Sequence, residues 1–200
     1  MAVILGVVLV LGLGFGLMVM GTYNGMVDRR EAVDASMTEI KNQYKRRFDL
    51  IPQLVETVKG AADFEQDTIT AVTAARAKVG SLQLPDDIES DPAAAEQFFA
   101  AQGELGGALG RLLVVAENYP NLTATDGFIE LQDQLEGTEN RVAVARRDAI
   151  EALKEHNAGV KRFPAVLIAG SMGFESLPQL EFDETDEALE TAPTVDFSDE

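Results

Sequence analysis

The chain has 200 residues, of which 34 are acidic and 16 basic, so its formal net charge is −18. Such an acidic chain is repelled by phosphate backbones, which argues against nucleic acid as a partner. It contains no cysteine, and therefore neither a disulfide nor a thiol nucleophile.

The chain opens with an apolar segment, residues 2–20, that carries no charged side chain. About 20 such residues span the hydrocarbon layer as a helix, so this segment predicts a transmembrane anchor over residues 1–21. No Lys or Arg precedes it, and Val19-Met20-Gly21 is a poor cleavage site, which favours a retained anchor over a signal peptide. Gly12 and Gly16 form a GxxxG pair that can let two membrane helices approach closely. The alternative is that glycine is simply common in membrane helices.

Helical periodicity dominates the rest of the chain. Apolar residues recur every three or four positions from Val33 through Tyr44, Ile51 and Val58, and less regularly to Val79. Because the phase is the same on both sides of Pro52, we expect one helix over about residues 21–79, kinked near residues 48–52. The alternative is that Asp49 caps a new helix whose first turn holds the proline.

Two further helices are expected. Residues 80–91 read as a loop, and Asp91-Pro92 is a typical helix start, so a second helix is predicted over about 92–117. After the break at 118–121, a third helix is predicted from near Thr125 to Asn157 or Gly159. Its expected buried face follows a three-four repeat: Phe128, Leu131, Leu135, Thr138, Val142, Ala145, Ala149, Ala152 and His156. Short connections imply antiparallel neighbours. The predicted fold is therefore all-α: an anchor that continues into an elongated antiparallel helical bundle over residues 22–164.

Two segments follow the bundle. Residues 165–182 begin as an apolar extension that is too short to span a bilayer, and packing along the bundle is its expected role. Contact with the membrane or with a neighbouring subunit is the alternative. Residues 183–200 are strongly acidic and lack periodicity, which predicts a disordered tail. Arg29, Arg30 and Lys41 follow the anchor, and by the positive-inside rule the soluble domain faces the cytoplasm.

Several separated motifs are similar to the LemA family. They are residues 23–27 (YNGMV), 45–60 (KRRFDLIPQLVETVKG), 117–120 (ENYP), 128–132 (FIELQ), 135–141 (LEGTENR) and 145–148 (ARRD). Departures occur at Met37 and Phe64, where the family usually has Trp and His, and at Ala149 and His156, where it has aromatic residues. The resemblance implies a single-pass bacterial inner-membrane protein with a helical soluble domain. It also implies a role in membrane organisation or in quality control, with a membrane metalloprotease among the partners, but no established biochemical activity.

The sequence contains no recognisable catalytic, cofactor or metal constellation, since His156 has no HxxxH or HxxE partner. The polar motifs instead predict ion pairs between two helices, with Arg46 or Arg47 facing Glu136 or Glu139. A partner-binding surface is the alternative for the same residues. The candidate structural or interaction residues are therefore Arg46, Arg47, Asp49, Pro52, Glu136, Glu139 and Arg141.

Two functions remain open at this point. The first is a non-enzymatic membrane scaffold or adaptor that forms homo-oligomers and contacts other membrane proteins. The second is a hydrolase at the membrane surface that uses paired carboxylates. A pocket with converging acids would favour the enzyme, and a solid bundle would favour the scaffold.

Overall fold

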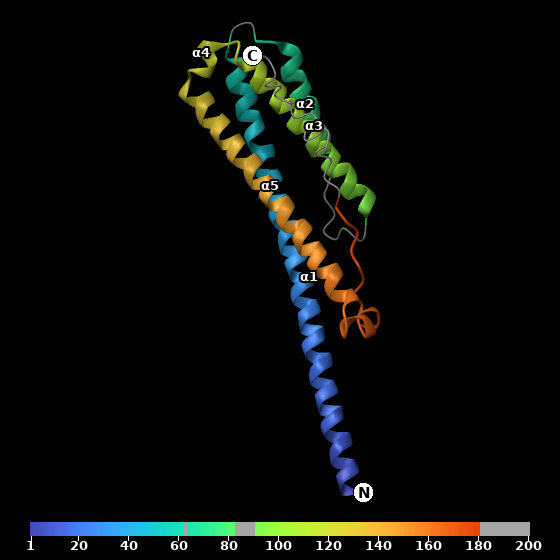
Figure 1. The fold of residues 1–200 in the computed structure, drawn as a ribbon. Coiled ribbons are helices and arrows are strands. Elements are labelled where there is room, and N and C mark those ends of the chain that lie inside the picture. The colour runs from blue at the N-terminus through green and yellow to red at the C-terminus, as the bar shows by residue number, and fades with distance from the viewer. Residues whose placement is uncertain (62–63, 83–90, 181–200) are drawn as a thin grey trace, which may run out of the picture.

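A computed structural model describes residues 1–61, 64–82 and 91–180, and these residues are mostly helical with no strand among them. The elements are α1 (Ala2–Lys59), α2 (Gln66–Gly80), α3 (Pro92–Ala116), α4 (Pro120–Thr123) and α5 (Asp126–Lys161), followed by two 3₁₀ turns, η1 (Ala165–Leu167) and η2 (Gly170–Met172). Figure 1 shows a long bundle from which the N-terminal part of α1 projects alone. The predicted fold class is confirmed.

Helix α1 is one continuous element of 58 residues that includes both the apolar segment and the first bundle helix. It is long and apolar enough to cross a membrane, and none of the residues in its most apolar stretch is buried by the rest of the protein. Pro52 lies inside it, and the helix is unbroken on both sides. The prediction that the helix passes through Pro52 is therefore confirmed.

The predicted extension of this helix to Val79 is wrong. Helix α1 ends at Lys59, where the Gly60 N–H bonds back to the carbonyl oxygens of Glu56 and Thr57, and a separate helix, α2, starts at Gln66. The apolar periodicity continues across the turn because α2 has a buried face of its own, formed by Ile69, Val72 and Val79. A repeat that resumes in a second helix looks the same in sequence as one that never stopped.

The predicted starts of the other two long helices are confirmed. At α3, the Asp91 side chain accepts a hydrogen bond from the Ala94 N–H at 2.9 Å, and Pro92 occupies the first turn. At α5, Thr125 is the N-cap and accepts from the Phe128 N–H. These caps satisfy N–H groups that have no partner within the helix. The expected loop over 80–91 lies mostly, and the expected tail over 183–200 entirely, outside the described residues.

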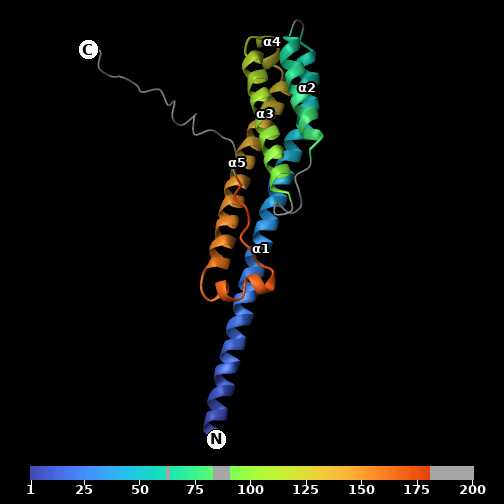
Figure 2. The same cartoon turned by 90° about the vertical axis from the view of Figure 1, so that its right-hand side faces the viewer.

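Two pairs of antiparallel helices build the bundle. Helices α1 and α5 lie side by side, and the α2–α3 hairpin covers only their half farthest from the N-terminus (Figures 1 and 2). The core follows the predicted stripes, because every predicted face residue of α5 except Ala152 is buried, as are Val33, Met37, Ile40, Tyr44, Ile51, Leu54 and Val58 of α1. Nearer the N-terminus, the pair is covered by the chain that follows α5.

That following chain folds back against the bundle. Ala165 and Ala169 are buried with Met26 of α1 and Val160 of α5 in a small apolar cluster. Leu177 is buried farther along, in the cluster that contains Phe98 and Phe99 of α3. Asn157 of α5 holds the returning chain in place. Its side chain accepts a hydrogen bond from the Leu177 N–H at 2.7 Å and donates one to the Leu177 carbonyl oxygen at 3.0 Å.

Candidate functional site: a buried arginine network

The centre of the bundle contains a polar network on three helices. Arg47 falls on the buried stripe of α1, three residues after Tyr44 and four before Ile51, and only 2% of it is exposed. Gln102 occupies the matching stripe position on α3 and is equally buried. A buried cation is costly unless it is paired and hydrogen-bonded, so its partners decide whether the bundle tolerates it.

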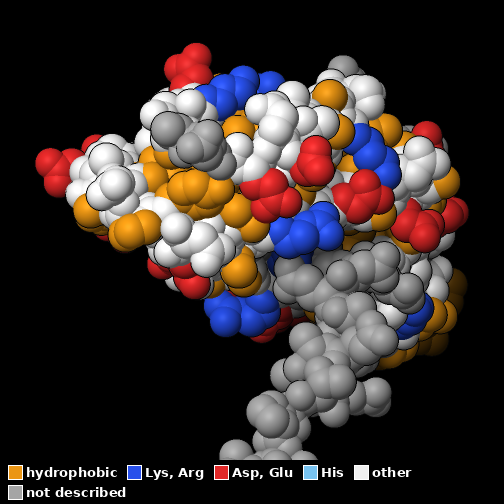
Figure 3. Space-filling view, turned by 90° about the horizontal axis from the view of Figure 1, so that it is seen from above, with side chains coloured by type: hydrophobic (Ala, Val, Ile, Leu, Met, Phe, Trp, Pro, Cys, Tyr) orange, Lys and Arg blue, Asp and Glu red, His pale blue; other side chains and the backbone are white. Residues whose placement is uncertain are grey.

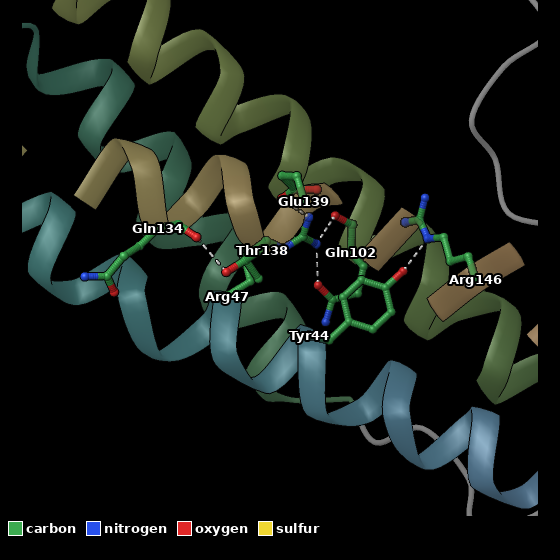
Figure 4. A network of polar contacts seen from close by, with 7 residues as sticks. All are labelled: Tyr44, Arg47, Gln102, Gln134, Thr138, Glu139 and Arg146. Carbon is green, nitrogen blue, oxygen red and sulfur yellow. Dashed lines mark hydrogen bonds and ion pairs between the residues drawn. The ribbon is translucent and has the colours of Figure 1, made fainter. Parts of the chain in front are cut away.

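Arg47 has partners on both neighbouring helices (Figure 4). Its Nη1 lies 2.6 Å from Oε1 of Glu139 on α5. Its Nη2 donates to the side-chain oxygen of Gln102 at 2.6 Å and to the Gln102 carbonyl oxygen at 2.9 Å. Nε is buried and has no hydrogen-bond partner. The guanidinium therefore joins α1, α3 and α5 at one level of the bundle.

Tyr44 connects this centre to a second buried arginine. Nε of Arg146 on α5 donates to the Tyr44 hydroxyl oxygen at 2.8 Å. The guanidinium carbons of Arg47 and Arg146 lie 5.3 Å and 5.6 Å from the centroid of the Tyr44 ring. Both distances allow a cation–π contact, which is stronger when the groups are desolvated. Tyr44 also packs edge-on against Phe98, so the network is bordered by apolar side chains.

The other predicted residues lie around this network, on its exposed side. Arg46 donates to Gln134 at 3.0 Å, and Arg141 donates to Gln43 and to the buried Thr138, each at 3.2 Å. Glu136 accepts from Gln132 on its own helix. Asp49 and Pro52 are on the exposed face of α1. The structure thus brings Arg47 and Glu139 together, and it places Arg46 and Glu136 with other partners.

Three members of the network were missed in sequence reasoning: Tyr44 as a polar partner, Gln102 and Arg146. A signal was present, because Arg47 and Gln102 are polar residues at positions where the three-four repeat requires buried ones. A polar residue on such a stripe indicates a buried partner. Nothing in the spacing indicates which residue that partner is.

His156 is buried, and its Nε2 lies 3.0 Å from the Glu175 carbonyl oxygen, while its Nδ1 has no partner. It therefore belongs to the contact between α5 and the returning chain. In the part of the chain that the structure describes, no group of three or more His, Cys, Asp or Glu side chains is arranged to hold a metal ion.

The surface of the bundle has several hollows. A pocket of about 420 Å³ lies beside the network, lined by Tyr44, Gln102, Phe48, Phe98 and the two lysines Lys41 and Lys45. A larger hollow of about 780 Å³ lies at the distal end, between the end of α1 and the 118–122 segment. Figure 3 looks down on that end, where acidic and basic side chains alternate around apolar ones. The described lining of these two hollows includes no carboxylate, whereas a third hollow of about 470 Å³ is lined by Glu151 and Glu155 of α5 together with Arg29, Arg147, Lys154 and Arg162.

These features define the class of protein: a helical-bundle protein that is continuous with a candidate membrane helix and has an arginine network at its centre. The sequence model of the LemA family matches residues 36–197, and the chain belongs to the LemA family. This confirms the resemblance drawn from the separated motifs.

Three similar proteins carry the name of magnetosome proteins. Magnetosome proteins MamQ 1 and MamQ 2 of Paramagnetospirillum magneticum are each 26% identical to this chain over 169 residues, which covers 76% of this chain and 62% of theirs. Magnetosome protein MamQ of Magnetospirillum gryphiswaldense is 24% identical over the same shares. The chain therefore spans less than two thirds of the length of these relatives.

Proposed function

We propose that this protein is a membrane-anchored helical scaffold that acts through self-association and through contacts with other proteins at the bacterial inner membrane. The observation that carries the proposal is the continuity of α1, which runs without a break from the apolar segment to the distal end of the bundle. At about 1.5 Å per residue, the 39 positions from residue 21 to 59 extend about 58 Å from the membrane. Such a helix transmits the position of the anchor to the whole bundle.

The arginine network supports a structural role. The hydrogen bonds of Arg47 to Glu139 and Gln102 end on atoms of the bundle itself, and Glu139 holds α5 against α1. A network of this kind fixes the register of three helices, as buried polar groups do in coiled coils. The register of the helices matters for a scaffold, because it determines which side chains lie together on the outer surface that partners contact.

The magnetosome relatives support a role in organising membrane, and the family resemblance adds membrane-protein quality control with a metalloprotease as a partner. Arg29, Arg30 and Lys41 follow the apolar segment, so the proposed orientation places the bundle in the cytoplasm. Self-association is proposed through Gly12 and Gly16, because a GxxxG pair permits a close helix–helix contact. An added Cβ would meet no atom of the same chain within 4 Å at these positions or at the other glycines of the apolar segment, so the segment is free to meet a second helix.

Cysteine crosslinking in native membranes tests the self-association. The chain has no cysteine, so Gly12→Cys and Gly16→Cys each introduce one thiol on the proposed contact face. Gly14→Cys is the matched control, because two positions along a helix rotate the side chain by about 200°. We expect oxidation to give a disulfide-linked dimer for positions 12 and 16 and little for position 14. Equal crosslinking at all three positions indicates random collision, and none at any position removes the anchor contact from the proposal.

A further inference from the structure

The turn that follows α5 exposes an apolar surface at the end of the bundle nearest the anchor. Four large side chains are open there: Phe163, Val166, Leu167 and Met172 are 75%, 54%, 70% and 38% exposed. Apart from the apolar segment of α1, exposed large apolar side chains elsewhere in the described bundle occur singly, as at Val114 or Ile129. A group of them within ten residues indicates a contact surface.

The turn is fixed in place beside α1. Ala165 and Ala169 pack against Met26, and the ring of Phe174 meets that of Tyr23 edge-on, with centroids 5.6 Å apart. Because Ala165 and Ala169 hold the turn against the bundle, the exposed residues in and beside η1 and η2 face away from it. Figures 1 and 2 both show this turn as the part of the bundle lying closest to the N-terminal half of α1.

The level of the turn along α1 matches a membrane surface. Met20 is the last residue of the apolar segment, and Met26 is six residues farther on, a rise of about 9 Å. The headgroup layer on each side of a bilayer is about 5 to 7 Å thick. Side chains that project from the Met26 level toward the anchor therefore reach this layer. Tyr23, which is half exposed, lies where aromatic residues are enriched in membrane proteins.

The charge of the turn also fits a membrane surface. The chain carries 34 acidic residues, yet none occurs from Lys161 to Phe174, and Lys161 and Arg162 open this stretch. Arg29 of α1 lies against Gly159 at the same level. Glu151 and Glu155 of α5 line a hollow together with Arg29 and Arg162. The 161–174 stretch itself is basic, apolar and free of acids, which suits the anionic, partly apolar surface of a bilayer.

We infer that residues 162–172 form a second membrane contact, in which the apolar side chains of the turn insert among lipid headgroups beside the anchor. This inference rests on the anchor of the proposed function. The anchor and the turn together hold the bundle at two points, and two points restrict tilting and rotation in a way that one helix cannot. The bundle is thereby set at a fixed angle to the membrane.

Depth-dependent fluorescence quenching tests this inference on the full chain. Single cysteines at Phe163 and at Leu167 are labelled with bimane, and the protein is reconstituted into phosphatidylcholine–phosphatidylglycerol vesicles that carry nitroxides on the headgroup, near the top of the acyl chain, or deep in it. Leu9→Cys is the control for the anchor. Val114→Cys, an equally exposed apolar site on α3, is the control for a surface away from the membrane.

We expect the labels at 163 and 167 to be quenched several-fold more by the headgroup and shallow nitroxides than the label at 114, and less by the deep one than the label at 9. If the labels at 163 and 167 behave as the label at 114 does while the label at 9 is quenched, the anchor stands and the second contact is overturned. Shielding of the labels at 163 and 167 from aqueous iodide without lipid quenching also overturns it, because a second copy or another protein then covers the turn. Failure of quenching at position 9 overturns the anchor itself.

Discussion

Arg76 of α2 compensates at Phe48 for the hydrogen bond that a proline removes. Its guanidinium lies over the Phe48 ring, 3.9 Å from the centroid, and its Nε donates to the Phe48 carbonyl oxygen at 3.4 Å. In a regular helix this oxygen accepts from the N–H of residue 52, but Pro52 has none. The α2 helix thus supplies the donor, and the proline in α1 becomes part of the docking site for α2.

A double-mutant cycle measures this coupling. Pro52→Ala restores the helical N–H, so the Phe48 oxygen no longer depends on Arg76. We expect Arg76→Met to cost about 1 to 2 kcal/mol in the native chain and roughly half that in the Pro52→Ala background. Guanidinium chloride unfolding in mild detergent, followed by far-UV circular dichroism, gives the free energies.

Lys78→Met is the matched control on the same helix. Lys78 pairs with Glu104 at 2.6 Å, but both side chains are about half exposed, so the loss should stay below about 1 kcal/mol and should not depend on residue 52. If Arg76→Met costs the same with Pro52 as with alanine at that position, the backbone hydrogen bond contributes nothing.

The second prediction concerns Arg47. We expect Arg47→Met to destabilise the bundle by about 2 to 4 kcal/mol, because Gln102 and Glu139 lose their donor together. Glu139 is 47% exposed, and its water access keeps the loss from being larger. Arg46→Met is the control, since Arg46 is exposed and its change should stay within about 0.5 kcal/mol. Equal losses at 46 and 47 would show that the network does not hold the helices.

Exchange of the two charges gives a complementary result. The double variant Arg47→Glu with Glu139→Arg should recover only part of the stability lost in Arg47→Glu alone. The reason is the Gln102 carbonyl oxygen, which accepts from Arg47 and has no hydrogen to offer a carboxylate. Full recovery would mean that the ion pair matters and the contact with α3 does not; no recovery would argue against the pair.

The third prediction isolates a hydroxyl group. Tyr44→Phe keeps the ring and its contacts with Phe98 but removes the acceptor of Arg146 Nε. Since Arg146 is buried, we expect a loss of about 1 to 2 kcal/mol in the unfolding measurement. Tyr23→Phe, at a half-exposed site, should change stability by less than about 0.5 kcal/mol. A neutral Tyr44→Phe would show that the hydroxyl contributes no net stability.

Periodicity predicted most of the fold because helices bury one stripe each. The stripes of the first and last bundle helices, the Asp91 cap and the Thr125 cap all follow from residue types at fixed spacing. The end of α1 at Gly60 could not be predicted from residue spacing. A glycine that ends a helix with an ordinary right-handed conformation, φ −69°, leaves no sequence mark that distinguishes it from a glycine within a helix.

The network was only partly predictable for a different reason. The charges on residues 46–47 and 136–141 indicate that two helices face each other, but four pairings satisfy that pattern. Which arginine is buried depends on the rotation of α1, and this is set by the stripe that includes Tyr44 and Ile51. Gln102 joins the network only because the α2–α3 hairpin covers that level of the bundle. Packing between distant parts of the chain is not visible in a local sequence pattern.

The fourth prediction concerns the N-terminus. The purified protein should retain residues 1–21, because the apolar segment is longer than the apolar core of a signal peptide and ends at a poor cleavage site. Intact mass spectrometry of protein extracted from the membrane fraction checks this. A mature chain that begins near Thr22 would convert the anchor into a signal peptide and leave the bundle without its membrane helix.

The measurement that tests the central claim most directly is the oligomeric state of the full-length protein at micromolar concentration, in mild detergent and in nanodiscs. A self-associating scaffold predicts a defined homo-oligomer in both, a smaller species for Gly12→Ile with Gly16→Ile, and no change for Gly14→Ile on the opposite face. A monomer in both environments would contradict the account.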